Sequence, residues 1–315
     1  MQKATIFTRL AILLFISGIL ISESAVAQSE EDTVTTTVVP VKKHKHRAGS
    51  IYLSWGYNEE WYTQSNVHVS QPSLGNDYEL VEVHAHDHLG WNSRLLHEAI
   101  SIPQYNYRLG YYFNEKQDLG IEINFDHTKY LIVDGQNIQF KGTMNHQPYN
   151  QEVLFSQANG FYYYLNNGAN FLLFNFVKRV GLYNTKDKKF RLDLTGKAGI
   201  GPVIPHVQDE FFGVPNQQHF QLGGWNTGVE TAVRATIMKY GYLEFSQKAD
   251  YARYSNLKIA DGTAKQNFGT YELILSVGAY LPTTRHNPMF TRSTPAPSED
   301  NSLGDGQLRN LDLNE

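Results

Sequence analysis

The amino-acid sequence predicts an all-β fold: an antiparallel up-and-down transmembrane β-barrel of eight strands with a filled polar lumen. Between about residues 51 and 281, apolar and polar side chains alternate over segments of strand length. Tight turns join these segments at one end and long polar, aromatic-rich stretches at the other, a pattern typical of outer-membrane barrels. A short apolar run near the N-terminus indicates export. The three observations together favour the bacterial outer membrane.

The first residues predict a signal peptide. Lys3 and Arg9 give the segment a positive start, and the apolar run from Leu10 to Ile21 is too short to span a bilayer. Ala25-Val26-Ala27 supplies a cleavage site of small residues. We therefore expect residues 1–27 to be removed after export.

Two polar tails flank the predicted barrel, which occupies residues 50–282. Residues 28–49 are expected to form a flexible periplasmic lead-in. Residues 283–315 are rich in Pro, Ser, Asn and Asp, and cannot bury enough apolar surface to offset the entropy of ordering them. We expect this C-terminal tail to be disordered, and both termini to be periplasmic.

The composition excludes several kinds of chemistry. The chain of 315 residues has no cysteine, so it forms neither disulfides nor thiolate metal sites. Its formal net charge is −4, and the one basic block runs from Lys42 to Arg47. Binding to nucleic acid is therefore not expected.

Eight segments are expected to span the membrane, an even number as in single-chain bacterial barrels. They are residues 50–60, 103–113, 119–132, 170–183, 189–203, 220–237, 242–256 and 268–281. Tight turns are expected at 114–118, 184–188 and 238–241, and long connections at 61–102, 134–169, 204–219 and 257–267. Three strand-like stretches inside these connections, 78–88, 136–144 and 153–165, are expected to extend hairpins above the membrane. A ten-stranded barrel is the alternative.

Each predicted strand has one apolar face and one mixed or charged face, as a period of two requires. In the second and third segments, Leu109 and Tyr111 oppose Arg108, and Ile121 opposes Glu122. The fifth, seventh and eighth segments repeat the pattern. Their opposing pairs are Leu192 with Asp193, Phe245 with Glu244, and Leu273 with Glu272.

The direction in which the charged faces point separates two architectures. A soluble barrel of the lipocalin type places its apolar face inside around a small ligand, whereas an outer-membrane barrel inverts this order. In the inverted arrangement, twelve charged residues, six of each sign, would form an ion-paired lumen. They are Arg108, Glu122, Asp126, Arg179, Arg191, Asp193, Lys197, Glu230, Arg234, Glu244, Lys248 and Glu272. Side chains fill an interior of eight strands, so no general pore is expected; a narrow channel for small or hydrophobic solutes is an alternative.

Alternating histidines in the first long connection form a candidate metal site. In an extended strand, His84, His86 and His88 would point to one side, about 7 Å apart. Neutral imidazoles so placed can bind zinc, copper or nickel. The alternative is a solvated polar strand with no metal and no other cofactor.

The seventh segment ends in Arg253-Tyr254-Ser255-Asn256. This stretch resembles the lipid A deacylases, outer-membrane enzymes that carry a His-x-Ser-Asn motif. Ser255 and Asn256 match that motif, but Arg253 stands in place of the histidine. The resemblance implies a lipid-modifying enzyme as an alternative function. Arginine stays protonated and cannot act as the base that a serine nucleophile needs, so catalysis is not expected.

Aromatic residues in the long connections suggest a recognition surface. Trp61 and Trp91 lie in the first connection, and Phe161, Tyr162 and Tyr163 lie in the second. Aromatic and amide side chains suit an extracellular carbohydrate or protein ligand. The alternative is an aromatic girdle in contact with outer-membrane lipids.

A wider resemblance supports the fold. The segment from Ile102 to Tyr111, together with that from Asp126 to Tyr130, resembles uncharacterised outer-membrane barrel proteins of Gram-negative bacteria. It implies no activity. Within this segment, Arg108 is expected to enter the lumen and pair with Glu122 or with Asp126. The sequence thus predicts a structural or surface-binding outer-membrane protein.

Overall fold

The computed structural model describes five parts of the chain: residues 49–88, 104–113, 118–166, 168–217 and 219–282. The predicted signal peptide, most of the lead-in, the C-terminal tail and Trp91 lie outside these parts. The described strands are β1 (Ser50–Tyr62), β2 (Ser65–Gln71), β3 (Asn76–Val83), β4 (Ala85–His86), β5 (Tyr105–Tyr112), β6 (Leu119–His127), β7 (Tyr130–Ile132), β8 (Gln136–Met144), β9 (Gln147–Phe155), β10 (Tyr162–Leu165), β11 (Phe171–Asn184), β12 (Phe190–Val203), β13 (Gln208–Phe211), β14 (Val214–Gln217), β15 (Gly224–Ile237), β16 (Gly241–Ile259) and β17 (Gly262–Pro282). Two short 3-10 turns, Pro72–Leu74 and Gln157–Asn159, complete the secondary structure.

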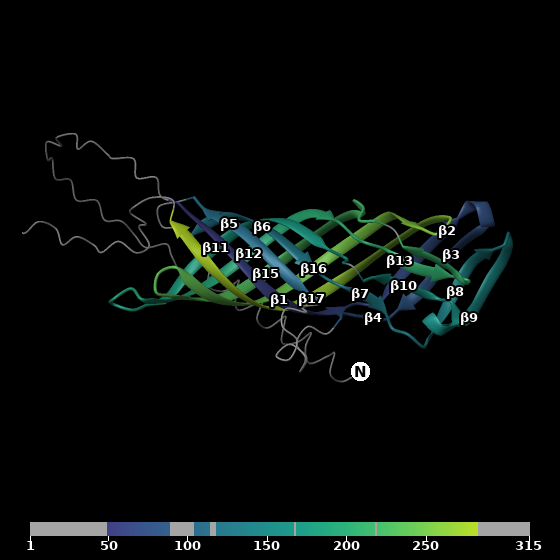
Figure 1. The fold of residues 1–315 in the computed structure, drawn as a ribbon, viewed down its shortest axis with the longest axis horizontal. Helices are drawn as coiled ribbons and strands as arrows, with labels where there is room; N and C mark the ends of the chain where they lie inside the picture. The colour runs from purple at the N-terminus through teal and green to yellow at the C-terminus, as the bar shows by residue number, and fades with distance from the viewer. Residues whose placement is uncertain (1–48, 89–103, 114–117, 167, 218, 283–315) are drawn as a thin grey trace, which may run out of the picture. The chain divides into compact units, whose positions relative to one another are not determined.

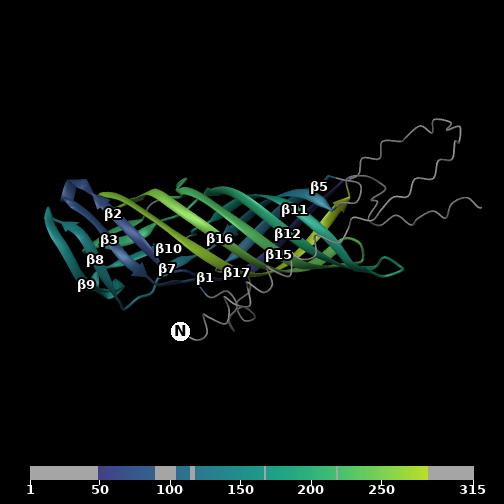
Figure 2. The same cartoon turned by 180° about the vertical axis from the view of Figure 1, so that it is seen from behind.

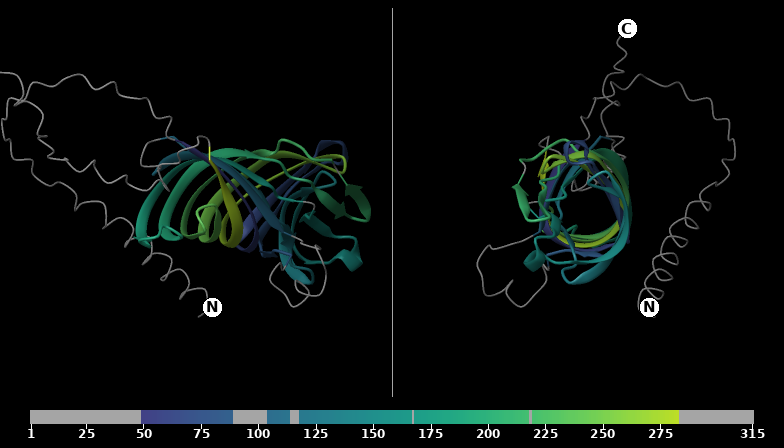
Figure 3. Two further views of the ribbon diagram at one scale, coloured as in Figure 1. Left: turned by 60° about the vertical axis from the view of Figure 1, so that its left-hand side comes forward. Right: turned by 90° about the vertical axis from the view of Figure 1, so that its right-hand side faces the viewer.

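Eight strands form a closed antiparallel ring. Their order is β1, β5, β6, β11, β12, β15, β16 and β17, each paired with the next. β17 closes the ring by pairing with β1 from Ser50 to Tyr62, and the right-hand view of Figure 3 looks along it. The predicted fold class and strand number are confirmed.

The remaining strands extend one end of the ring, where Figure 1 shows β2, β3, β8 and β9. β2 pairs with β17, β3 with β2 and β8 with β3, so they continue the wall of the barrel. The predicted long connections therefore contain ordered hairpins. We call the part formed by β2–β4, β7–β10, β13, β14 and the adjoining ends of β1, β16 and β17 the extension.

The predicted long connection at 257–267 is wrong. β16 and β17 run on as one hairpin, joined by a turn at Ala260 and Asp261, with Ile259 opposite Gly262. The reason is that only one face of this hairpin is polar. Leu257 and Ala264 are buried, whereas the outward side chains make the same stretch resemble a loop.

The opposite end of the ring has short turns. Residues 185–189 join β11 to β12, and residues 238–240 join β15 to β16. β1 begins at this end and β17 ends there, since Ser50 pairs with Pro282; Figure 2 shows the same arrangement from behind.

The barrel wall is apolar outside and charged inside. Ile121 and Phe176 are 57% and 54% exposed on the outer face, whereas Arg234 and Glu244 are fully buried in the lumen. This order excludes the soluble lipocalin type and is that of an outer-membrane barrel. The chain is located in the bacterial outer membrane. Within the described residues, no helix is long and apolar enough to cross a membrane.

Arginines and tyrosines fill the lumen near the short turns. The residues are Arg179, Arg234, Tyr52, Tyr112, Tyr242 and Tyr280, all buried. The Arg234 guanidinium lies 4.2 Å from the centre of the Tyr242 ring and 4.6 Å from that of Tyr52. Such cation–π contacts are strongest where water is excluded. Gly110 and Gly278 make room for two of these rings, because a Cβ at either glycine would overlap the ring of Tyr52 or Tyr242.

Ion pairs cross the middle of the lumen. Arg108 contacts Glu230 at 2.5 Å and Glu244 at 3.5 Å. Lys197 lies 3.1 Å from each of Glu122, Glu230 and Glu244. Nearer the short turns, Arg191 is half-buried and pairs with Asp193 at 2.6 Å.

The predicted ion-pair partners of Arg108 are wrong. Arg108 contacts β15 and β16 across the lumen rather than Glu122 or Asp126 on the neighbouring β6. In the β5–β6 register, it lies opposite Asn124. Glu122 accepts a hydrogen bond from Tyr52 at 2.8 Å, while Asp126 is 2.5 Å from a lysine. The narrow ring brings distant strands as close as adjacent ones.

In the part of the lumen nearer the extension, carboxylates outnumber cations. Lys248 contacts Asp126 at 2.5 Å, Asp250 at 2.9 Å and Glu272 at 3.4 Å. Glu60 is also buried and interacts electrostatically with Asp126 and Lys248. The predicted lumen set of six positive and six negative residues did not include Asp250 or Glu60.

An apolar core closes the lumen at the extension. Tyr130 stacks on Phe268 with ring centres 4.5 Å apart, and Tyr254 stacks on the same ring at 5.4 Å. Val67 and Leu80, on β2 and β3, are fully buried in this core. Packed apolar side chains therefore fill the barrel where the extension begins, and no open channel mouth lies there among the described residues.

We predict that Arg108→Met lowers the temperature at which the heat-modifiable band shifts on a gel. The substitution leaves Glu230 and Glu244 buried with less positive charge around them. Breaking a buried pair typically costs 3–5 kcal/mol, and we expect about 3 kcal/mol because Lys197 still contacts both carboxylates.

Arg253→Met is the matched control, since Arg253 is exposed and has no ion pair among the described residues. An equal shift temperature for the two variants would contradict the lumen assignment of Arg108.

Candidate functional site

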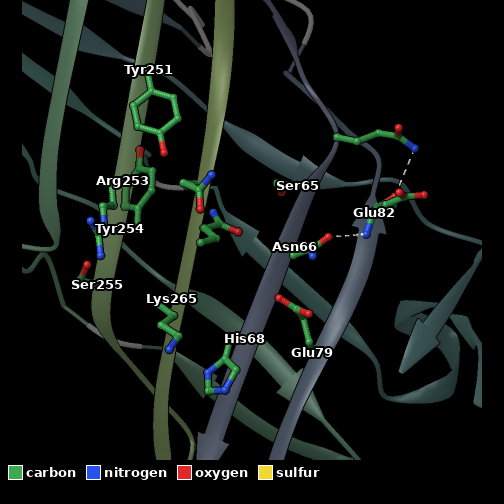
Figure 4. A pocket seen from close by; sticks show the side chains of 13 residues that line it. Ser65, Asn66, His68, Glu79, Glu82, Tyr251, Arg253, Tyr254, Ser255 and Lys265 are labelled. Atoms are coloured by element: carbon green, nitrogen blue, oxygen red, sulfur yellow. Dashed lines mark hydrogen bonds between the residues drawn. The ribbon is translucent and has the colours of Figure 1, made fainter. Parts of the chain in front are cut away.

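A polar groove lies on the outer wall where the extension begins. Its volume is about 640 Å³, and it is bounded by β16 and β17 on one side and by β2 and β3 on the other. The lining residues are Gln64, Ser65, Asn66, His68, Glu79, Glu82, Tyr251, Arg253, Tyr254, Ser255, Lys265, Gln266 and Asn267. Figure 4 shows the side chains that line it. We call this the outer groove.

Strand alternation directs the side chains of β16 into the outer groove. Arg253 is exposed and Ser255 is half-buried, while Ala252 and Tyr254 between and beside them are buried. A β-bulge follows, because the register with β17 shifts between Tyr254 and Leu257. Because β16 has one extra residue here, Leu257 lies on the inward face of the strand, as Tyr254 does.

A row of residues in backbone register crosses the groove. Lys265 on β17 lies opposite His68 on β2, and His68 lies opposite Glu79 on β3. The His68 side chain contacts the exposed Asp77, with Nε2 at 2.7 Å from the carboxylate. The backbone ladders of these strands join the hairpin wall to the barrel wall.

Two exposed cations of the groove have no ion-pair partner in the described parts of the chain: Arg253 and Lys265. Arg253 pairs in register with Asn267, which is two residues from Lys265 on the same face. The two cations are therefore diagonal neighbours on adjacent strands.

A buried glutamine lies behind the same groove. Gln266 is 3% exposed, and neither its side-chain nitrogen nor its oxygen has a hydrogen-bond partner within the described residues. Because Gln266 alternates with the outward Lys265 and Asn267, its side chain lies on the inward face with Ala264 and Phe268. Asn267 is therefore the amide that β17 presents on the outer wall.

The hairpin wall is held by side-chain amides. Asn66 Oδ1 accepts a hydrogen bond from the Glu82 backbone N–H at 2.8 Å, drawn as a dashed line in Figure 4. The Gln64 amide donates to the Glu82 carbonyl at 3.4 Å. Glu82 has a φ of 54°, and these contacts fix it in that uncommon conformation.

The apolar core behind the hairpin contains one buried carboxyl. Asp209 on β13 is fully buried and accepts a hydrogen bond from the Asn216 amide at 2.6 Å. Burial raises the pKa of Asp209 to about 7, although the hydrogen bonds from Asn216 and from the Ala260 backbone oppose the rise. Its charge also raises the pKa of the nearby Tyr78 phenol, to which burial is the larger contributor.

The three histidines of the candidate metal site remain separate. His84 contacts the Gln64 amide at 2.9 Å, and His86 Nδ1 contacts the carbonyl of Asp87 at 2.5 Å. His88 is anchored through its backbone, which donates to Gln104. Among the described residues, no three His, Cys, Asp or Glu side chains form a group that could hold a metal. The strand β4 is too short to align three imidazoles on one face.

The deacylase-like residues lie in the outer groove. Ser255 makes no hydrogen bond to a histidine in the described structure, and Asn256, with a φ of 56°, occupies the bulge. Arg253 is an exposed cation on the same wall. Among the described residues, no hydrogen bond joins the Ser255 hydroxyl to a base.

The aromatic residues of the second connection are part of the core. Tyr163 is fully buried and Tyr162 is 7% exposed, so the expectation of an aromatic recognition surface there is wrong. The strands of the extension need apolar side chains to pack against each other. Trp225, Tyr251 and Trp61 are instead exposed on the outer wall; Trp225 packs on Tyr251 and Trp61 on the half-buried Tyr271, with ring centres 5.9 and 6.0 Å apart.

Comparisons with known proteins add a general likeness. No protein-family model matches the chain, and no curated protein matches its sequence. Ail, the attachment invasion locus protein of Yersinia pestis, solved with the heparin analogue sucrose octasulfate, is 16% identical over 74% of this chain and 99% of its own, with a TM-score of 0.31. OprG from Pseudomonas aeruginosa is 9% identical over 75% and 97%, with a TM-score of 0.33. The Escherichia coli protease OmpT is 11% identical over 74% and 95%, with a TM-score of 0.28. These values bear on neither the activity nor the ligand of this chain.

We predict that the extension is less stable at neutral pH than in acid, because of Asp209. A carboxyl whose pKa is raised in the folded state favours folding most when it is protonated. The stability of the extension should therefore fall as pH rises from about 4 to about 7 and then level off. The full change is on the order of 4 kcal/mol, at about 1.4 kcal/mol for each tenfold change in proton affinity.

Hydrogen-exchange protection factors of β10 and β13 amides, corrected for the intrinsic effect of pH, would measure this change. Asp209→Asn should remove the pH dependence, and an unaltered dependence in that variant would contradict the assignment.

Proposed function

We propose that this chain is a surface-binding outer-membrane protein whose outer groove binds a carbohydrate. The observation that carries the proposal is a polar groove of about 640 Å³ on the outer wall, lined by the outward side chains of Asn267 and Ser255 beside the exposed ring of Tyr251. Pockets that bind small molecules place a few polar groups where they fix the orientation of the ligand. The filled lumen favours function on the outer wall.

The chemistry of the groove suits sugar hydroxyl groups. Each hydroxyl donates one hydrogen bond and accepts others, and amides offer both partners. Asn66 and Asn267 supply amides from the strands β2 and β17, and Ser255 supplies a hydroxyl. Tyr251 adds an exposed aromatic ring at one end of the groove, as Figure 4 shows.

The proposal includes an orientation. Short turns face the periplasm in bacterial outer-membrane barrels, and longer connections face outward. We place the turns at residues 185–189 and 238–240, together with both termini, in the periplasm. The extension and the outer groove then face the outside of the cell, where a carbohydrate could reach them.

Binding of a panel of neutral oligosaccharides to the full chain in detergent, followed by saturation-transfer NMR, tests the proposal. We predict that Ser255→Ala and Asn267→Ala each weaken binding by about tenfold, as expected for the loss of one well-placed hydrogen bond. Asn137→Ala is the matched control, since Asn137 is exposed on β8 and lies outside the groove.

Either of two results would contradict the proposal. The first is that no sugar of the panel binds. The second is that Asn137→Ala weakens binding as much as the groove variants do.

A further inference from the structure

We infer that the outer groove selects a phosphorylated saccharide, with Arg253 and Lys265 as the phosphate contacts. The inference rests on the proposed carbohydrate binding and names the class of sugar. Both side chains are exposed, line the groove and have no ion-pair partner in the described residues. Phosphate oxygens accept charge-assisted hydrogen bonds from guanidinium and ammonium groups.

The groove separates its charges by wall. Arg253 and Lys265 belong to the barrel strands β16 and β17, whereas Glu79 and Glu82 belong to β3 of the hairpin. Figure 4 shows the cations and the carboxylates on opposite sides. A ligand with one anionic end and several hydroxyl groups fits this division, because its phosphate is attracted to one wall and repelled by the other.

Two other exposed lysines of this chain contact carboxylates, whereas Lys141, Lys186 and Lys258 have no ion pair among the described residues. Lys178 lies 2.7 Å from Asp118, and Lys189 lies 3.7 Å from Asp187. In the groove, Glu79 pairs in register with His68 and lies beyond it from Lys265. The charge of Lys265 is therefore available to a ligand.

Outward groups of the groove distinguish a phosphorylated sugar from a bare anion. Asn267 and Ser255 line the groove on the same face as Arg253 and Lys265. Phosphate oxygens accept from the Asn267 amide but do not donate to its oxygen when fully ionised, whereas a sugar hydroxyl does. The groove should then bind a sugar phosphate more tightly than inorganic phosphate.

Two sources could supply such a ligand. Tyr251 lines the groove and lies next to Trp225 on the outer wall, in the manner of an aromatic band at the membrane surface. A phosphorylated glycolipid of the outer leaflet could therefore reach the groove from the side. A soluble sugar phosphate could reach it from the outside solution.

Calorimetry with the full chain tests the inference, using glucose 6-phosphate, glucose and inorganic phosphate as soluble probes. Glucose 6-phosphate should bind about tenfold more tightly than either other probe. Arg253→Gln and Lys265→Gln should each lower the ratio of glucose 6-phosphate affinity to glucose affinity from about ten to about one. Lys258→Gln, which removes an exposed cation of β16 outside the groove, should change nothing.

A second arm identifies the source. The chain is placed in nanodiscs that contain a phosphorylated diglucosamine lipid, with or without prior phosphatase treatment, and lipid retention is measured for the same variants. Retention that depends on the phosphate and on Arg253 assigns the site to a membrane lipid. Phosphate-dependent binding confined to the soluble arm assigns it to a soluble sugar phosphate.

Three results would overturn the inference. Equal binding of glucose and glucose 6-phosphate removes the role of phosphate but leaves the proposed carbohydrate function. Equal binding of inorganic phosphate and glucose 6-phosphate, unaffected by Asn267→Ala, indicates a plain anion site. No phosphate-dependent binding in either arm excludes a phosphorylated saccharide altogether.

Discussion

The constraint on which the structure depends is the narrow ring of eight strands. Inward side chains meet across such a ring, so every buried charge must find a partner within it. Arg234 contacts Glu244 at 2.5 Å and packs between two tyrosine rings, and Arg108 reaches the same carboxylate from the other side of the barrel. Ion pairs and aromatic rings fill the interior, and the outer wall remains free for recognition.

The longest hairpin serves both sides of the wall. Alternate residues of β16 and β17 point inward, where Lys248 and Glu272 join the lumen ion pairs, and outward, where Arg253 and Lys265 line the outer groove. Between these levels, the buried ring of Phe268 seals the lumen from the extension. A rigid wall of this kind suits a binding site built on strands. The groove side chains are already positioned before a ligand binds, so less conformational entropy is lost on binding.

Most of the barrel could be predicted from the alternation of apolar and polar residues, because successive side chains of a strand point outward and inward in turn. It placed Glu122 and Glu244 in the lumen and set the boundaries of most strands within a few residues. The partners of Arg108 could not be predicted, since contacts across a lumen depend on closure of the ring. The outer groove was also missed. It requires the pairing of Gln266 with Val67, a long-range register, and a bulge after Tyr254 that no local pattern indicates. An unexplained hydroxyl at Ser255 on the outward phase was the one signal near it.

The central claim is that the lumen is filled and that function resides on the outer wall. Single-channel recording of the full chain in planar lipid bilayers tests it most directly. The ion-paired lumen, sealed by tyrosines at one end and by an apolar core at the other, predicts little or no steady conductance. Large, stable open channels would contradict it.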